Sequence, residues 1–261
     1  PIDFEISPSF FRQSDIRVVT AFTIQTQNRE LVFTDVGGLQ TARLNIVGQV
    51  SAVTGRSVGV FEDSVTTTAT SSELNEAKER KSAYSKAIVL SPGRYRVAVR
   101  VRDIESGAEG IKHLAFQVPS FAENKLAISS LILTSKLESL KDEPTVGPFV
   151  IGQHKVIPNL THVYQQGQTV GLYLQIYNSE IDQTTLRPSI DVEYVLTRDG
   201  KEVQRQKEDW NDVQGTGDRL TLARFIDTRT AKPGEYEVVI NIRDRVSGQR
   251  ISPSARFTIA Q

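Results

Sequence analysis

The sequence predicts an all-β protein built of two tandem immunoglobulin-like (fibronectin III-like) β-sandwich domains. Three observations lead to this prediction: an internal repeat, alternation of apolar and polar residues along several segments, and very little helical periodicity. A chain of 261 residues has room for two domains of ordinary size. Hydrophobic residues make up 38% and charged residues 24%, a balance typical of globular chains rather than disordered ones.

The internal repeat is the most informative feature. Residues 90–107 (LSPGRYRVAVRVRDIESG) align without a gap with residues 231–248 (AKPGEYEVVINIRDRVSG). The matched positions of this structural repeat are Pro92 and Pro233, Gly93 and Gly234, Tyr95 and Tyr236, and Asp103 and Asp244. Because the match includes Pro, Gly, Tyr and Asp as well as β-branched residues, we favour a true repeat over chance similarity between two β-rich stretches.

Each copy of the repeat predicts a turn followed by a half-buried strand. The Pro-Gly pair favours a turn, since Pro fixes φ and Gly accepts positive φ. After it, Tyr95, Val97, Val99 and Val101 alternate with other residues and share one face of a strand. A Tyr at the start of such a strand, directly after a tight turn, is typical of the tyrosine corner of immunoglobulin-like sandwiches.

The remaining strands follow the same rule. In chain order, they are predicted within residues 2–6, 18–24, 43–53, 126–133, 170–176 and 190–196. We expect residues 2–6 to form the ordinary first strand of the first domain; the alternative is a strand donated to a neighbouring molecule. Residues 126–133 are apolar enough to be either the first strand of the second domain or part of an interface.

One segment is a candidate helix. It covers residues 72–86, with Ser71 or Ser72 as the N-cap, and follows a Thr- and Ser-rich loop at residues 66–72. For this charged segment we favour a solvated connection over a docking helix. The domains are then residues 1–120 and residues 121–261, joined without a Gly- and Ser-rich linker.

Composition excludes several kinds of site and partner. The chain has 31 Lys and Arg residues, 31 Asp and Glu residues, no Cys and no Met. Zero net charge argues against nucleic-acid binding, and the absence of Cys excludes disulfides, a Cys zinc site and a thiol nucleophile. No apolar run approaches the roughly 18 residues of a transmembrane segment. The absence of both sulfur residues favours an extracytoplasmic location, either secreted, periplasmic or at the cell surface.

No motif indicates catalysis, a cofactor or a metal. His113, His154 and His162 do not have the spacing of metal ligands. The Gly-x-Gly at residues 215–217 precedes no helical pattern, so it indicates a loop rather than a phosphate cradle. The Asp-rich segment 209–218 matches no EF-hand, and we favour a polar hairpin tip over a calcium loop. We therefore predict no catalytic, cofactor-binding or metal-binding residue, and no enzyme.

The strongest candidate interaction surface is a row of arginines. Alternation places Arg94, Arg96, Arg100 and Arg102 on the outward face of one predicted strand. Their guanidinium groups could bind phosphate, a sulfated glycan or an acidic partner. The alternative, which we favour from the sequence, is cross-strand pairing with acidic residues of neighbouring strands.

The second domain differs at the same face. It carries Glu235 and Glu237 where the first domain carries arginines. A head-to-tail contact between copies of the chain would bring these opposite charges together, which makes self-assembly one hypothesis.

Tyrosines of the second domain form a further candidate surface. Tyr164, Tyr173, Tyr177 and Tyr194 cluster there, and alternation places Tyr173 and Tyr177 opposite the predicted apolar face of their strand. Exposed tyrosines can stack on sugar rings or anchor a protein interface. The alternative, to which we give more weight, is that this face packs within the protein or is half buried.

Much of the chain resembles known bacterial proteins. The stretch 84–110 (YSKAIVLSPGRYRVAVRVRDIESGAEG) is similar to the C-terminal regions of GWxTD-domain proteins and of von Willebrand factor A-related proteins found notably in Acidobacteria, and the likeness continues through residues 118–121, 126–133 and 172–178. The Gly-Trp-x-Thr-Asp motif itself is absent, as is the Asp-x-Ser-x-Ser metal-adhesion motif. The resemblance implies the downstream β-sandwich part of an exported protein, and it implies no catalytic residue.

Together, these features favour a non-catalytic extracytoplasmic structural or interaction protein of a bacterium. Its expected partner is another protein or further copies of itself, with a glycan as a further candidate. The alternative is a carbohydrate-binding or accessory module of a larger secreted protein.

Overall fold

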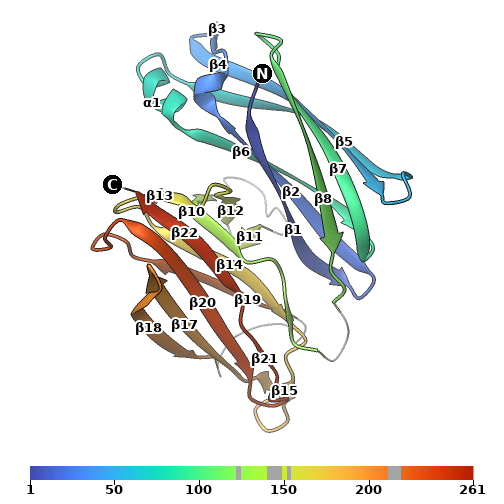
Figure 1. Cartoon of the computed structure of the whole chain (residues 1–261), viewed down its shortest axis with the longest axis vertical. Helices are drawn as coiled ribbons and strands as arrows, with labels where there is room; N and C mark the ends of the chain where they lie inside the picture. The colour runs from blue at the N-terminus through green and yellow to red at the C-terminus, as the bar shows by residue number, and fades with distance from the viewer. Residues whose placement is uncertain (122–124, 140–148, 152–153, 211–218, 261) are drawn as a thin grey trace. The chain divides into compact units, whose positions relative to one another are not determined.

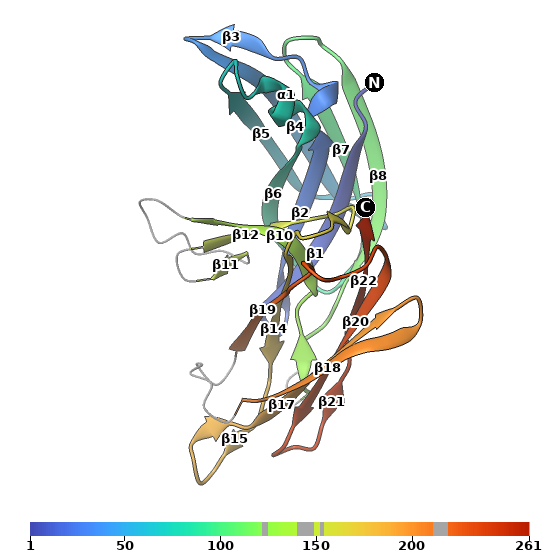
Figure 2. The ribbon, with the colours of Figure 1, turned by 90° about the vertical axis from the view of Figure 1, so that its left-hand side faces the viewer.

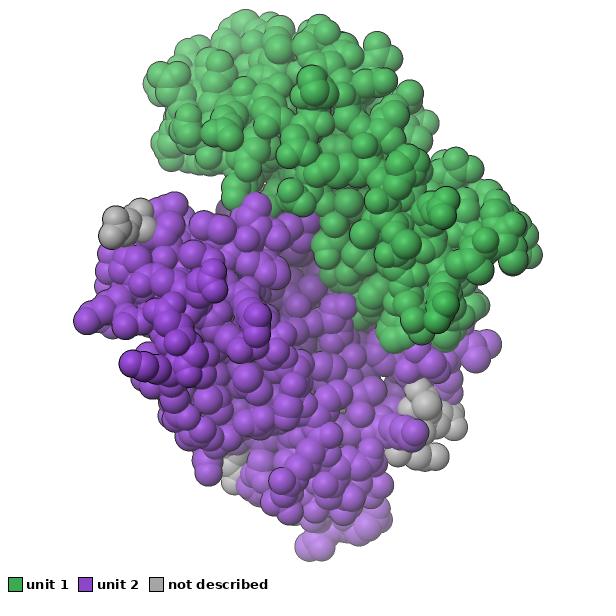
Figure 3. Space-filling view, viewed as in Figure 1, with its two compact units in different colours: residues 1–10, 17–119 green, residues 11–16, 120–261 purple. Residues whose placement is uncertain are grey.

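The computed structural model describes residues 1–121, 125–139, 149–151, 154–210 and 219–260 (Figure 1). Within these ranges nearly all regular structure is β-strand; helical turns are confined to Asn28–Glu30 and the short helix α1, Leu74–Glu79. The predicted all-β class is therefore confirmed. Contacts divide the chain into two compact units, the first holding Pro1–Phe10 and Arg17–Pro119 and the second holding Phe11–Ile16 and Ser120–Gln261 (Figure 3).

The first unit has two sheets around one core. Their strand orders are β1-β2-β6 and β3-β4-β7-β8, with β5 also paired to β4. Phe22 of β2 packs against Phe61 of β5 and Phe116 of β8, with ring centroids 5.8 and 5.3 Å apart, so the two sheets face each other. The strands are β1 Phe4–Ser14, β2 Arg17–Gln27, β3 Thr34–Val36, β4 Leu39–Ala52, β5 Ser57–Ala69, β6 Lys81–Leu90, β7 Gly93–Asp103 and β8 Glu109–Val118.

The second unit repeats this plan with more strands. Its sheets have the orders β11-β12-β10-β14-β19, with β9 paired to β14, and β13-β22-β20-β17-β18, with β21 paired to β20; β15 and β16 form a separate pair. The strands are β9 Ala127–Ile128, β10 Ile132–Ser139, β11 Val150–Ile151, β12 His154–Pro158, β13 Val163–Gln165, β14 Val170–Tyr177, β15 Ile181–Asp182, β16 Arg187–Pro188, β17 Ile190–Arg198, β18 Lys201–Asp209, β19 Arg219–Ile226, β20 Gly234–Asp244, β21 Arg250–Ile251 and β22 Ser254–Ala260.

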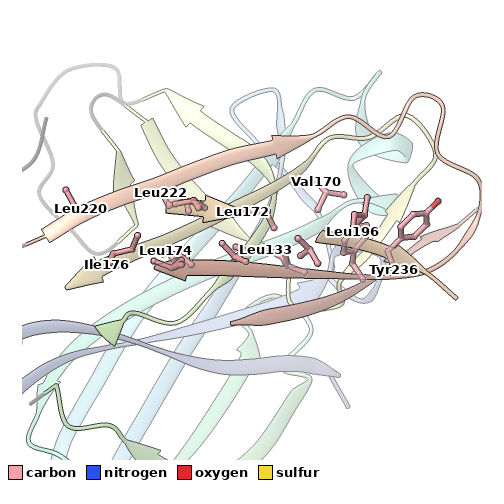
Figure 4. Close-up of a cluster of buried hydrophobic side chains, with 14 of the residues drawn as sticks. Leu133, Val170, Leu172, Leu174, Ile176, Leu196, Leu220, Leu222 and Tyr236 are labelled. Carbon is pink, nitrogen blue, oxygen red and sulfur yellow. The ribbon is translucent and has the colours of Figure 1, made fainter. Parts of the chain in front are cut away.

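The core of the second unit lies between its two sheets (Figure 4). The side chains labelled there come from β10, β14 and β19 of one sheet and from β17 and β20 of the other: Leu133, Val170, Leu172, Leu174, Ile176, Leu220, Leu222, Leu196 and Tyr236. Burial of these apolar faces is the main stabilising contribution to such a fold.

The repeat appears in both units as the same turn and strand start. Gly93 has φ 155° and Gly234 has φ 150°, values that favour glycine. Two residues later, the hydroxyl of Tyr95 donates to the carbonyl of Ser91 (2.9 Å), and that of Tyr236 donates to the carbonyl of Lys232 (2.7 Å). The predicted tyrosine-corner hydrogen bond is thus present in each unit.

The matched aspartates are fully buried, and each fixes two separate pieces of chain. The Asp103 carboxylate accepts hydrogen bonds from the backbone N–H of Glu105 (2.9 Å) and of the distant Val32 (2.8 Å). Asp244 does the same with Val246 and Glu180, both at 2.9 Å. Each carboxylate therefore ties the turn after its strand to a loop from elsewhere in the unit.

The candidate helix at residues 72–86 is mostly wrong. Helix α1 ends at Glu79, and β6 begins at Lys81 and pairs with β2 in continuous register from Gln27↔Lys81 to Val18↔Leu90. The predicted loop at residues 66–72 is also wrong in part, because β5 continues to Ala69 along β4. Cross-strand hydrogen bonds outweigh the helix-favouring composition here, and the β-branched threonines of residues 66–68 suit a strand.

For two further segments the sequence left alternatives open, and the structure shows which unit each segment belongs to. Residues 2–6 belong to the first unit: Ile2 and Phe4 are buried, and β1 is hydrogen-bonded to β2 of the same chain. Residues 126–133 supply Leu126 and Leu133 to the core of the second unit, and they form β9 and the start of β10 there.

Candidate functional site

The four predicted arginines lie on the outward face of β7. Along this strand Val97, Val99 and Val101 are buried, whereas Arg94, Arg96, Arg100 and Arg102 are exposed. We call these four side chains the arginine face. At about 3.3 Å per residue, the row extends over about 26 Å.

The neighbours of the arginine face are mostly uncharged. Arg100 lies opposite Val47 of β4 and Ile111 of β8, and Arg96 lies opposite Ser51 and Ala115. Figure 2 shows β7 and β8 side by side. Within the described chain none of the four arginines forms an ion pair, although Glu109 lies opposite Arg102 in register. The cross-strand pairing favoured from the sequence is therefore not seen in the described part.

A neighbouring arginine, outside the arginine face, does have an acidic partner. Arg43 of β4 forms an ion pair with Glu105, beyond the end of β7. Guanidinium groups without such a partner can form bidentate hydrogen bonds to carboxylates or phosphates of another molecule. The arginine face thus presents unpaired donors in a regular row.

The matching face of the second unit has no such row. Its strand β20 carries Glu235, Glu237, Asn241 and Arg243 at the equivalent positions. Glu237 pairs with Arg256 of β22 at 3.3 Å, so one of the two acids of the head-to-tail hypothesis already has a partner within its own unit.

The prediction of Tyr173 and Tyr177 as an exposed interaction surface is wrong. Both are 1% exposed, because β14 is an interior strand of its sheet and both of its faces are covered. Within the second unit, the ring of Phe11 lies 6.2 Å from that of Tyr173, and the ring of Phe121 lies 5.2 Å from that of Tyr177. These rings cannot stack on a ligand.

Their hydroxyls belong to a buried network. The Gln175 amide donates to Tyr173 Oη (2.9 Å), and the Tyr177 hydroxyl donates to Gln175 Oε1 (2.7 Å). Burial raises the pKa of Tyr177 to about 12. Tyr173 and Tyr177 therefore stabilise the fold of the second unit.

A group of side chains with no sequence motif, here called the Glu208 cluster, lies between β17, β18 and β19. Glu208 of β18 accepts hydrogen bonds from Arg224 Nε (2.9 Å), Trp210 Nε1 (3.1 Å) and the Tyr194 hydroxyl (3.4 Å). The Arg224 guanidinium lies over the Trp210 ring, 5.6 Å from its centre. The aromatic residues were visible in the sequence, but only the pairing of β17 with β18 and the approach of β19 bring them together.

The other residues considered for chemistry lie apart. His113 is exposed on β8, His154 lies on β12 and His162 precedes β13. Among the described residues, no group of three or more His, Asp or Glu side chains could hold a metal ion. Residues 211–218, including the Gly-x-Gly, lie outside the described residues, and Asp209 is described only as the end of β18. No helix in the described ranges is long and apolar enough to span a membrane.

Comparisons with known proteins add little. No protein-family model matches the chain, and no curated protein matches it. Among solved structures, it is similar to a calcium-binding mutant of Bacteroides uniformis beta-glucuronidase 2, with 10% sequence identity and a TM-score of 0.30. The match covers 97% of this chain and 27% of that protein. A TM-score of this size transfers neither a detailed fold nor an activity.

Proposed function

We propose that this chain is a non-catalytic interaction module that works outside the bacterial cytoplasm and binds an acidic protein segment through the arginine face. The observation that supports this function is the row of four exposed arginines that form no ion pair within the described chain. Nothing in the fold requires this row, since the matching strand of the second unit folds without it.

The geometry favours an extended partner. Arg94 and Arg96, like Arg100 and Arg102, are two residues apart on a strand, which separates their Cα atoms by about 7 Å. Alternate side chains of an extended peptide have the same spacing, so acidic residues at every second position would match both pairs. Because the groups are exposed, the interaction should weaken as salt shortens the Debye length to about 8–10 Å.

Two features support the architecture and the location. A tyrosine corner in each unit is typical of immunoglobulin-like sandwiches, so we infer that both units are of this type. A sequence with neither Cys nor Met suits an oxidising exterior, as does the resemblance to the sandwich portion of exported bacterial proteins.

The test uses a fluorescently labelled peptide in which Glu alternates with Thr, long enough to span Arg94 to Arg102. Binding to the full chain is followed by fluorescence anisotropy at low and physiological salt. We expect Arg96→Gln combined with Arg100→Gln to weaken binding about tenfold, the loss expected for two exposed charge contacts.

The matched control removes the same charge from the second unit through Arg243→Gln with Arg250→Gln. These arginines are exposed and lie opposite each other in register. An equal loss in both double variants, or no binding by the unaltered chain, would overturn the proposal. Light scattering over a range of concentrations tests self-assembly: a growing mass that is reduced only by the Arg96 and Arg100 changes would make the partner a second copy.

A further inference from the structure

A cleft opens between the edge strands β18 and β19 of the second unit. Each of these strands lies at the end of its sheet, and in the described part each pairs with a single neighbour: β18 with β17, and β19 with β14. Within the described part, the two sheets are therefore not joined by strand pairing along this side.

The cleft has an apolar floor and a polar rim. Its volume is about 230 Å³. The half-buried Tyr194 and Ile226 form its apolar floor, above the buried core residues Leu172, Leu196 and Val238. Gln204 and Gln206 of β18 line one side. A second cavity of about 270 Å³ shares Leu196, Gln204, Ile226 and Asp227 with the first, so the depression continues along the open side of the sandwich.

One end of the cleft is held by the Glu208 cluster. Four side chains donate to this carboxylate, those of Arg224, Trp210, Tyr194 and Gln206, and together they fix its orientation. The hydrogen bond from Arg224 is the main reason why the pKa of Glu208 lies below its usual value. Since Arg224 and Glu208 neutralise each other, and Asp227 pairs with Arg229, the lining carries no uncompensated charge.

The inward side of β18 argues against an added strand as the occupant. Gln204, Gln206 and Glu208 face the cleft, whereas an inserted strand would need apolar partners for its own inward residues. Polar inward side chains are one way in which edge strands avoid strand addition. The occupant should instead be polar around its edge, apolar on one face and uncharged.

We infer that this cleft binds a neutral sugar unit of a polysaccharide. The C–H face of a sugar ring can pack against the exposed parts of Tyr194 and Ile226. Its hydroxyls can both donate to and accept from the side-chain amide of Gln204, and can donate to Gln206 Oε1, since the Gln206 NH2 group already donates to Glu208 (3.3 Å). In the described chain the side-chain amide of Gln204 forms no hydrogen bond, so this group is available to a ligand. The volume is below the range of about 300–1,000 Å³ for drug-sized ligands, which suits one ring, with the adjoining cavity for the next.

This inference is independent of the arginine face. The cleft lies in the second unit and would bind a neutral ligand, whereas the arginine face lies in the first unit and would bind an acidic one. It also replaces Tyr173 and Tyr177 as the place where sugar recognition would occur, since those rings are buried.

The chain contains a single Trp, and the guanidinium of Arg224, a residue of the cleft lining, lies 5.6 Å from the centre of the Trp210 ring. Trp210 fluorescence is therefore sensitive to a displacement of Arg224. Neutral oligosaccharides of glucose, mannose, galactose and xylose, in α and β linkage, are titrated into the full chain. We expect a saturable change in Trp210 emission for at least one class, with the affinity checked by calorimetry.

Two variants of exposed side chains on β18 decide the site. Gln204→Ala with Gln206→Ala should weaken that affinity at least about tenfold, whereas Lys207→Ala, at a neighbouring position of β18 outside the cleft lining, should leave it unchanged. Circular dichroism confirms that each variant folds. The inference fails if no neutral oligosaccharide gives a saturable change, if the double variant binds as well as the unaltered chain, or if only sulfated or uronic sugars bind.

Discussion

The two units of the molecule share the same hydrogen bonds around a matched aspartate and a matched tyrosine, but they differ in the charges on their surfaces. Asp103 and Asp244 accept equivalent backbone hydrogen bonds, and Tyr95 and Tyr236 form the same corner. The outward face of β7 carries the unpaired arginines, while that of β20 carries Glu237 in an ion pair. A buried polar group that loses its partner is costly, whereas an exposed charge contributes little to stability.

The open edges of the two units show a related difference. In the first unit, Asp63 of β5 accepts hydrogen bonds from Tyr84 (2.8 Å) and Lys86 (3.3 Å) of β6. In the second, Glu208 of β18 pairs with Arg224 of β19. Each sandwich thus carries a carboxylate on one edge strand that holds a cation on the edge strand of the other sheet, but a cleft with a polar rim adjoins Glu208.

The largest effect is expected from removing the matched aspartates. Asp103→Ala and Asp244→Ala should each lower the free energy of unfolding by about 3 kcal/mol or more, since each buried carboxylate accepts from backbone N–H groups of two separate segments. Urea unfolding measures both. Asp35→Ala, which removes an exposed turn carboxylate that accepts from Gly38, is the control and should change little. A marked difference between the two aspartate variants would break the equivalence of the units.

A smaller effect is expected at the tyrosine corners. Tyr95→Phe and Tyr236→Phe keep the ring and remove only its hydrogen bond, so each should cost about 1 kcal/mol. Tyr236 is 5% exposed and Tyr95 is half-buried, so the carbonyl left unpaired is better shielded in the second unit. Thermal unfolding should therefore show the larger loss for Tyr236→Phe, and the reverse order would contradict this reading of burial.

The smallest effect concerns acid pH and the two edge carboxylates. The hydrogen bond from Arg224 lowers the pKa of Glu208, and that from Tyr84 lowers the pKa of Asp63. A carboxylate with a lowered folded pKa adds stability that is present above its unfolded pKa, about 4, and is lost as the pH falls through the folded value.

Each variant without the charge should consequently lose less stability between about pH 5 and pH 3 than the unaltered chain does. The change should be greater for Glu208→Gln than for Asp63→Asn, because the Glu208 side chain is 18% exposed and that of Asp63 is 42% exposed. Unfolding by urea at several pH values measures it. Parallel pH profiles for all three proteins would show that neither ion pair contributes.

The sequence by itself determined the strand periodicity, the Pro-Gly turns, the tyrosine corners and the outward position of the arginines. These features depend on residues a few positions apart, where side-chain alternation and turn chemistry act locally. Cross-strand pairing overrode the local composition of residues 81–86, which form part of β6 rather than a helix.

Only the tertiary structure decided what covers each face. Alternation placed Tyr173 and Tyr177 opposite Leu172 and Leu174, but whether that second face meets water depends on elements distant in the sequence, and here it is buried. The same holds for the cleft: Gln204, Glu208 and Arg224 have no sequence motif, and they meet because two sheets place their edge strands on the same side of one core. Burial and convergence are properties of packing between elements, which no short-range pattern encodes.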